Sequence, residues 1–128
     1  MKTVDASFLI NYLVYPEEFD KHSELIDDIL IAPAILIPEF LNALRKMVFR
    51  KILPRALANE IADRFADLPF SLFDLKDHRI ELWNLLSNFT PYDATYVLLA
   101  QSTQTPLLTS DARLARAAER STDVILVK

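Results

Sequence analysis

The chain has 128 residues, 52% of them hydrophobic, a net charge of −4, and neither cysteine nor glycine. Without cysteine it can form no disulfide, thiolate zinc site or cysteine nucleophile, and without glycine it lacks the Walker loop, the GxGxxG turn and the GxSxG nucleophile elbow. The acidic charge also argues against a protein held on nucleic acid mainly by bulk electrostatics.

Short apolar runs alternate along the chain with longer amphipathic ones. Each short run is too short for a helix, and most are rich in valine, isoleucine, leucine or phenylalanine. This alternation is typical of βα units packed on a parallel sheet, so we predict an α/β fold. The predicted strands are Thr3 to Asp5, Ile29 to Ala32, Phe70 to Asp74, Pro106 to Thr109 and Val124 to Val127.

Apolar residues at helical spacing fill the intervals, and we predict that they face the core. Three stripes stand out: Phe40, Leu44, Met47 and Val48; Leu57, Ile61 and Phe65; and Ile80, Trp83 and Leu86. Pro54 separates two of the longer helices, because proline starts helices well but interrupts their interiors. The length suits a single domain, 1–128, and no membrane span or signal segment is visible, so we expect a cytoplasmic protein.

Four acidic residues stand at predicted strand ends or helix starts. Asp5 closes the first strand, Glu39 follows a proline at a predicted helix start, Asp93 ends the segment TPYD, and Asp111 ends the segment LLTSD. Open parallel sheets usually place their sites at the carboxyl ends of strands and at the helix starts that follow. We therefore predict that these four side chains converge.

Each acid taken alone also has a purely structural explanation. Acids at helix N-termini accept hydrogen bonds from unpaired N–H groups and favour the helix macrodipole. In TPYD, Thr90 is a predicted N-cap, Pro91 the first helical residue and Asp93 the acid of a capping arrangement. Capping and catalysis are compatible, so neither interpretation is excluded.

Taken together, the four acids indicate a bound cation. If they met at about 5 Å, each pair of carboxylates would repel by roughly 3 kcal/mol at an effective dielectric constant of 20. Such a cluster needs protons or a cation, and carboxylate oxygens select Mg²⁺ or Mn²⁺. Mg²⁺ keeps waters that can act as nucleophile, so the pattern predicts a metal-dependent phosphodiesterase site.

The acids also stand in four motifs that resemble a known signature. They are Asp5-Ala6-Ser7, Pro38-Glu39, Tyr92-Asp93-Ala94 followed by Tyr96 and Ala100, and Leu108-Thr109-Ser110-Asp111. In this order and at this spacing they resemble the PIN-domain family, over nearly the whole chain. With no appended domain, the chain resembles the stand-alone VapC-type toxins of toxin–antitoxin pairs.

The resemblance implies a three-layer α/β/α sandwich with a parallel sheet of about five strands in the order 3-2-1-4-5, and endoribonuclease activity with Mg²⁺ or Mn²⁺. Asp5 and Asp93 would hold the metal most directly, while Glu39 and Asp111 would complete its shell or position water. Ser7 and Thr109 match the family's hydroxyl positions. For these two, helix capping and the positioning of water or metal are equal alternatives.

Basic residues are candidates for contact with an RNA backbone. Arg113 is the first candidate for a phosphate contact, although an ion pair with a neighbouring acid would explain it equally well. For the others we favour solvated helix faces: Arg116 and Arg120, and the group Arg45, Lys46, Arg50, Lys51 and Arg55. His22 and His78 lack ligand spacing, and we expect them at the surface.

The resemblance further implies a homodimer and a cognate antitoxin whose tail lies across a groove beside the acids. Six apolar residues are candidates to line that groove, although core packing is the favoured interpretation for most of them. They are Phe8, Leu9, Tyr12, Leu13, Phe40 and Leu41.

Two other functions stay open. A receiver-like phosphoryl-transfer domain would need a second acid beside Asp5 and a lysine late in the chain, but Ala6 and Ser7 follow Asp5 and the only late lysine is Lys128. A non-catalytic binding module with the same fold would be favoured by the loss of one of the four acids. None is lost.

Overall fold

The computed structural model describes all 128 residues around a five-stranded parallel sheet. The strand order is β3-β2-β1-β4-β5, which confirms the expected 3-2-1-4-5. All five predicted strands are present, and every end lies within one residue of its predicted place. The strands are β1 (Lys2–Val4), β2 (Leu30–Pro33), β3 (Phe70–Phe73), β4 (Leu107–Thr109) and β5 (Val124–Leu126).

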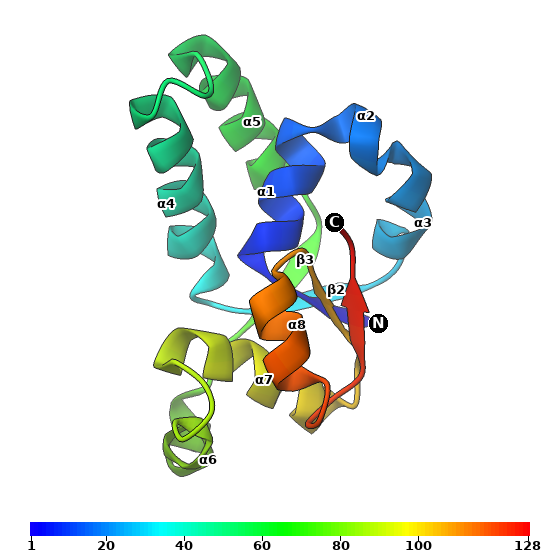
Figure 1. The fold of residues 1–128 in the computed structure, drawn as a ribbon, viewed down its shortest axis with the longest axis vertical. Helices are drawn as coiled ribbons and strands as arrows, with labels where there is room; N and C mark the ends of the chain where they lie inside the picture. The colour runs from blue at the N-terminus through cyan, green and yellow to red at the C-terminus, as the bar shows by residue number, and fades with distance from the viewer.

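Helices cover both faces of the sheet and make it the middle of three layers (Figure 1). One face carries α1 (Ala6–Val14), α2 (Pro16–Phe19), α3 (Ser23–Ile26), α4 (Leu36–Phe49) and α5 (Arg55–Asp67). The other carries α6 (Arg79–Leu85), α7 (Pro91–Thr103) and α8 (Ala112–Ala118), and short 3₁₀ turns span Asp20–His22 and Lys76–His78. The expected α/β/α sandwich is confirmed. None of the helices combines the length and apolar composition that crossing a membrane requires.

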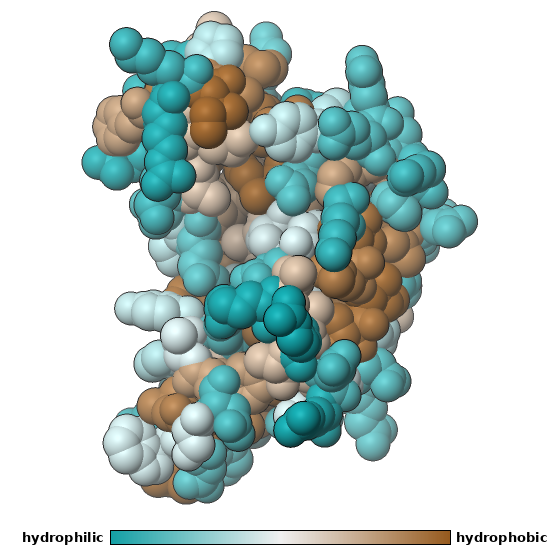
Figure 2. Space-filling view, in the orientation of Figure 1, coloured by the Kyte–Doolittle hydropathy of each residue, from teal (hydrophilic) through white to brown (hydrophobic).

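Most residues of the first two predicted apolar stripes face the core, as predicted. Phe40 of α4 and Phe65 of α5 are buried and stacked, with ring centroids 3.8 Å apart. The prediction is wrong for Ile80 and Trp83 of the third stripe, which are each 70% exposed, and for Leu57 of the second, which is 36% exposed. Leu86 of the third stripe packs against the core. Helix α6 packs mainly on α7, and its opposite face, which carries Ile80 and Trp83, is left uncovered. Figure 2 shows hydrophobic surface around α6 at the lower left and near the α4–α5 turn at the upper left, and a larger hydrophobic area on the right, below α3.

Because the chain has no glycine, other residues occupy the left-handed positions that follow two of its helices. Lys51 after α4 and Gln104 after α7 both adopt positive φ, at 59° and 54°, which glycine adopts without a steric penalty. At the end of α7 the N–H of Thr105 donates to the carbonyl of Ala100, and the N–H of Gln104 donates to that of Gln101. These two bonds form a Schellman motif, which usually has glycine at the left-handed position.

We therefore expect Gln104→Gly to stabilise the protein by about 1 kcal/mol, because it relieves the left-handed strain at the end of α7. Ser102→Gly is the matched control, since Ser102 is exposed and lies inside the same helix, where glycine costs roughly 0.5–1 kcal/mol. Urea unfolding followed by circular dichroism measures both. Equal destabilisation by the two substitutions would contradict the prediction.

Candidate active site

The site lies at the carboxyl ends of β1 and β4, which are neighbours at the centre of the sheet. Here the chain switches from building one half of the sheet to building the other, and open α/β sheets bind ligands at such points. Asp5 directly follows β1, and Asp111 follows β4 as the N-cap of α8. Glu39 and Asp93 lie in the first turns of α4 and α7. Helix α4 begins at Leu36, so it starts earlier than the proline-glutamate pair had indicated.

Asp5 is the most buried acid of the site, with only 4% of its surface exposed. Its Oδ1 accepts hydrogen bonds from the backbone N–H of Phe8 (3.0 Å) and from the hydroxyl of Ser7 (2.8 Å), and its Oδ2 accepts one from Thr109 (2.5 Å). Burial raises the pKa of Asp5 to about 6, an effect that these bonds oppose and the charge of Asp111 adds to. The hydrogen bonds therefore hold the carboxylate in one orientation, and burial makes its ionisation unfavourable.

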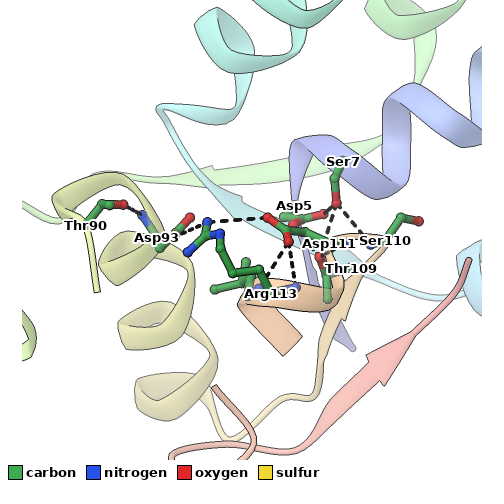
Figure 3. Close-up of polar contacts among 9 residues, drawn as sticks. Asp5, Ser7, Thr90, Asp93, Thr109, Ser110, Asp111 and Arg113 are labelled. Atoms are coloured by element: carbon green, nitrogen blue, oxygen red, sulfur yellow. Dashed lines mark hydrogen bonds and ion pairs between the residues drawn. The ribbon is translucent and has the colours of Figure 1, made fainter. Parts of the chain in front are cut away.

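Ser7 and Thr109 hold Asp5 and do not cap helices. The N-caps of α1 and α8 are Asp5 and Asp111 themselves, so the capping alternative for the two hydroxyls is wrong. Their oxygens lie 3.1 Å apart. The hydroxyl of Ser7 also accepts from the N–H of Ser110, and that of Thr109 from the N–H of Asp111. This network ties the turn after β1 to the turn after β4 (Figure 3).

Arg113 lies between Asp93 and Asp111 (Figure 3). Its Nη2 is 2.8 Å from Oδ2 of Asp93 and 3.5 Å from Oδ2 of Asp111. The ion-pair interpretation of Arg113 is therefore confirmed. Asp93 also takes part in the predicted cap, because its N–H donates to the hydroxyl of Thr90 (3.1 Å). The predicted convergence of the four acids is only partial, because no three acidic side chains stand close enough to share one ion.

Glu39 is held by Tyr96, a contact that the sequence did not predict. The phenol of Tyr96 donates to Oε1 of Glu39 at 2.5 Å. Burial raises the pKa of Tyr96, so the phenol stays a donor. Burial also raises the pKa of Glu39, Tyr96 opposes this and Asp93 adds to it. Tyr96 follows Asp93 by three residues on α7, so helical spacing was the available signal that both lie on one face.

The remaining candidates lie outside this cluster. The other basic residues are exposed and form no ion pair with an acid, as solvated helix faces would: Arg45, Lys46, Arg50, Lys51, Arg55, Arg116 and Arg120. His22 is half-buried against Phe19, and His78 pairs with Glu81. Of the six groove candidates, four are core residues: Phe8, Leu9, Leu13 and Phe40. Tyr12 is half-buried and Leu41 is exposed, so these six do not form one surface.

Known proteins share both this sequence pattern and this fold. The model of the PIN domain family matches residues 2–120. Ribonuclease VapC1 of Mycobacterium tuberculosis is 35% identical over 108 residues, covering 81% of this chain and 79% of that protein. Ribonuclease VapC12 of the same organism is 31% identical over 96 residues, covering 75% and 74%. The crystal structure of PAE2754 from Pyrobaculum aerophilum has the same fold, with a TM-score of 0.69 at 24% identity over 95% of this chain and 89% of that one. The resemblance carried by the four motifs is confirmed.

Burial of Asp5 predicts a pH-dependent stability. The folded protein keeps the Asp5 proton up to about pH 6, whereas the unfolded chain loses it near pH 3.8. Because the folded state binds more protons between these values, this contribution is fully present below pH 3.8 and is lost as the pH rises through 6. The loss amounts to roughly 3 kcal/mol at pH 7.

We expect Asp5→Asn to remove this slope, so that the variant gains stability relative to the wild type between pH 4 and pH 7. Urea unfolding in EDTA at several pH values measures the difference. Asp63→Asn is the matched control, since Asp63 is exposed on α5 and should keep the wild-type slope. Parallel pH profiles for the wild type and Asp5→Asn would contradict the prediction.

Proposed function

This chain belongs to the PIN-domain family, and we propose that it is a metal-dependent endoribonuclease, the toxin of a toxin–antitoxin pair in the cytoplasm. The observation that carries the proposal is the buried carboxylate of Asp5, which is held by Ser7 and Thr109 and lies near the charge of Asp111. Costly burial of a charged group at a strand end is typical of functional sites. The similarity to proteins named ribonucleases supports RNA as the substrate.

The four acids fit a hard divalent cation by their chemistry, because every ligand atom that they offer is a carboxylate oxygen. To share one ion, their side chains would have to move closer together. Asp5 and Asp93 would hold the ion most directly, and Asp111 and Glu39 would complete its shell or position water. Mg²⁺ or Mn²⁺ bound there would polarise the scissile phosphate and lower the pKa of a bound water. Both ions match the donor set equally well.

The chain's own residues prepare the site. Ser7 and Thr109 fix the orientation of Asp5, and Tyr96 fixes that of Glu39, so the carboxylates are ordered before substrate arrives. Arg113 is the nearest cation and our candidate for contact with an RNA phosphate. Because the net charge is −4, contact with RNA must be made locally, at these groups.

The first experiment is cleavage of a mixed RNA pool by the purified protein with Mg²⁺ or Mn²⁺. We expect EDTA to abolish cleavage and Asp5→Asn or Asp93→Asn to slow it by roughly 100-fold or more, since each removes a carboxylate from the metal. Asp63→Asn should cleave at the wild-type rate. If the wild type, free of antitoxin, cleaves nothing with either metal, the non-catalytic binding module becomes the better proposal.

The proposal includes a homodimer and a cognate antitoxin. Exposed apolar side chains on α6 and α4, among them Trp83 and Phe49, provide surface that such partners would cover. We expect sedimentation velocity at micromolar concentration to give twice the chain mass of 14.7 kDa. A strict monomer at that concentration would remove the dimer from the proposal and leave the nuclease site unaffected.

A further inference from the structure

Arg113 has a place in the site that capping and packing do not require. It is the only basic side chain in an ion pair with any of the four site acids. Its side chain is 67% exposed, whereas those of Asp93 and Asp111 are 16% and 34% exposed. The guanidinium therefore covers two less exposed carboxylates from the solvent side (Figure 3).

Arg113 contacts carboxylate oxygens that accept no hydrogen bond from a backbone N–H group. Oδ1 of Asp111 accepts the N–H groups of Arg113 and Leu114 as the cap of α8, and this leaves Oδ2 for the guanidinium. Asp93 uses its N–H in the cap of α7 and offers Oδ2 to the same nitrogen of Arg113. One cation thus lies between carboxylates from two helices, which would otherwise repel each other.

We propose that Arg113 is a built-in counter-ion of the metal-free site, and that a divalent metal ion must displace it from Asp93 and Asp111. This inference rests on the proposed function, which puts the metal on these acids. A guanidinium and a divalent cation cannot occupy the same oxygens, and their charges repel. The backbone N–H of Arg113 stays in the α8 cap while the exposed side chain swings outward. Arg113 therefore weakens metal binding and neutralises the acids in its absence.

The alternative is that Arg113 only ties α7 to α8 and orients the acids for the metal. The two roles predict opposite effects of removing the charge. A competing cation lowers the affinity for metal, so its loss tightens binding, whereas loss of an orienting contact weakens binding. An exposed ion pair of this kind contributes little to global stability, so substitution of Arg113 should leave the protein folded.

Isothermal titration calorimetry with Mn²⁺ distinguishes these roles. We expect Arg113→Gln to bind Mn²⁺ on the order of three- to tenfold more tightly than the wild type, because one positive charge beside the ion is lost. Arg113→Lys keeps the positive charge beside the acids and should stay within about twofold of the wild type. Arg116→Gln is the matched control, since Arg116 is exposed on the same helix and contacts none of the acids; its affinity should also stay within about twofold.

A second readout is the thermal midpoint in EDTA and in saturating Mn²⁺. Because Arg113→Gln leaves the acids unneutralised without metal and binds metal more tightly, Mn²⁺ should raise its midpoint more than that of the wild type. Unchanged or weaker Mn²⁺ affinity in Arg113→Gln, beside normal binding by the wild type, would overturn only this inference. Absence of Mn²⁺ binding in both proteins, or equal binding by Asp5→Asn, would overturn the proposed metal site with it.

Discussion

The structure of the site depends on one buried carboxylate, that of Asp5. A charged group out of water is costly unless it is hydrogen-bonded, and Asp5 receives donors from α1 and from the end of β4. The bond from Thr109 joins residues 104 positions apart in the chain. Because this bond bridges neighbouring central strands, it fixes the turn after β1 against the turn after β4. The other acids are positioned on helices that pack around this point.

Each of the four acids has a hydrogen-bond or ion-pair partner, and Asp93 and Asp111 share theirs. Asp5 is bonded by hydroxyls, Glu39 by the phenol of Tyr96, and Asp93 and Asp111 by the guanidinium of Arg113. Carboxylates brought to one edge of a sheet repel, and separate donors lower that repulsion while leaving the side chains ordered. Burial is the first cause of the raised pKa values of Asp5 and Glu39, and the charges of Asp111 and Asp93 add to it. A metal ion bound as proposed would oppose both effects, since a positive charge beside the acids favours their ionised form.

Much of this could be predicted from the sequence, because short apolar runs locate strands and acids beside them locate the carboxyl edge. The cap of Asp93 by Thr90 followed from three adjacent residues. Two features could not be predicted. The stripe that includes Trp83 shows which face of α6 is apolar, but the chain supplies no element to cover that face. The bond from Tyr96 to Glu39 joins residues 57 positions apart and depends on how α7 packs across the sheet.

If the site works as proposed, the net charge of the chain repels RNA, whereas the metal ion and Arg113 attract it. A net charge of −4 repels a polyanion, but salt screens exposed charges beyond about 10 Å at 0.1 M. Attraction must then come from the metal and from Arg113 within a few ångströms of the scissile phosphate. Only an RNA segment that enters the edge of the sheet gains that attraction. On this proposal the protein binds RNA at the cleavage site and has little affinity for RNA at the rest of its surface.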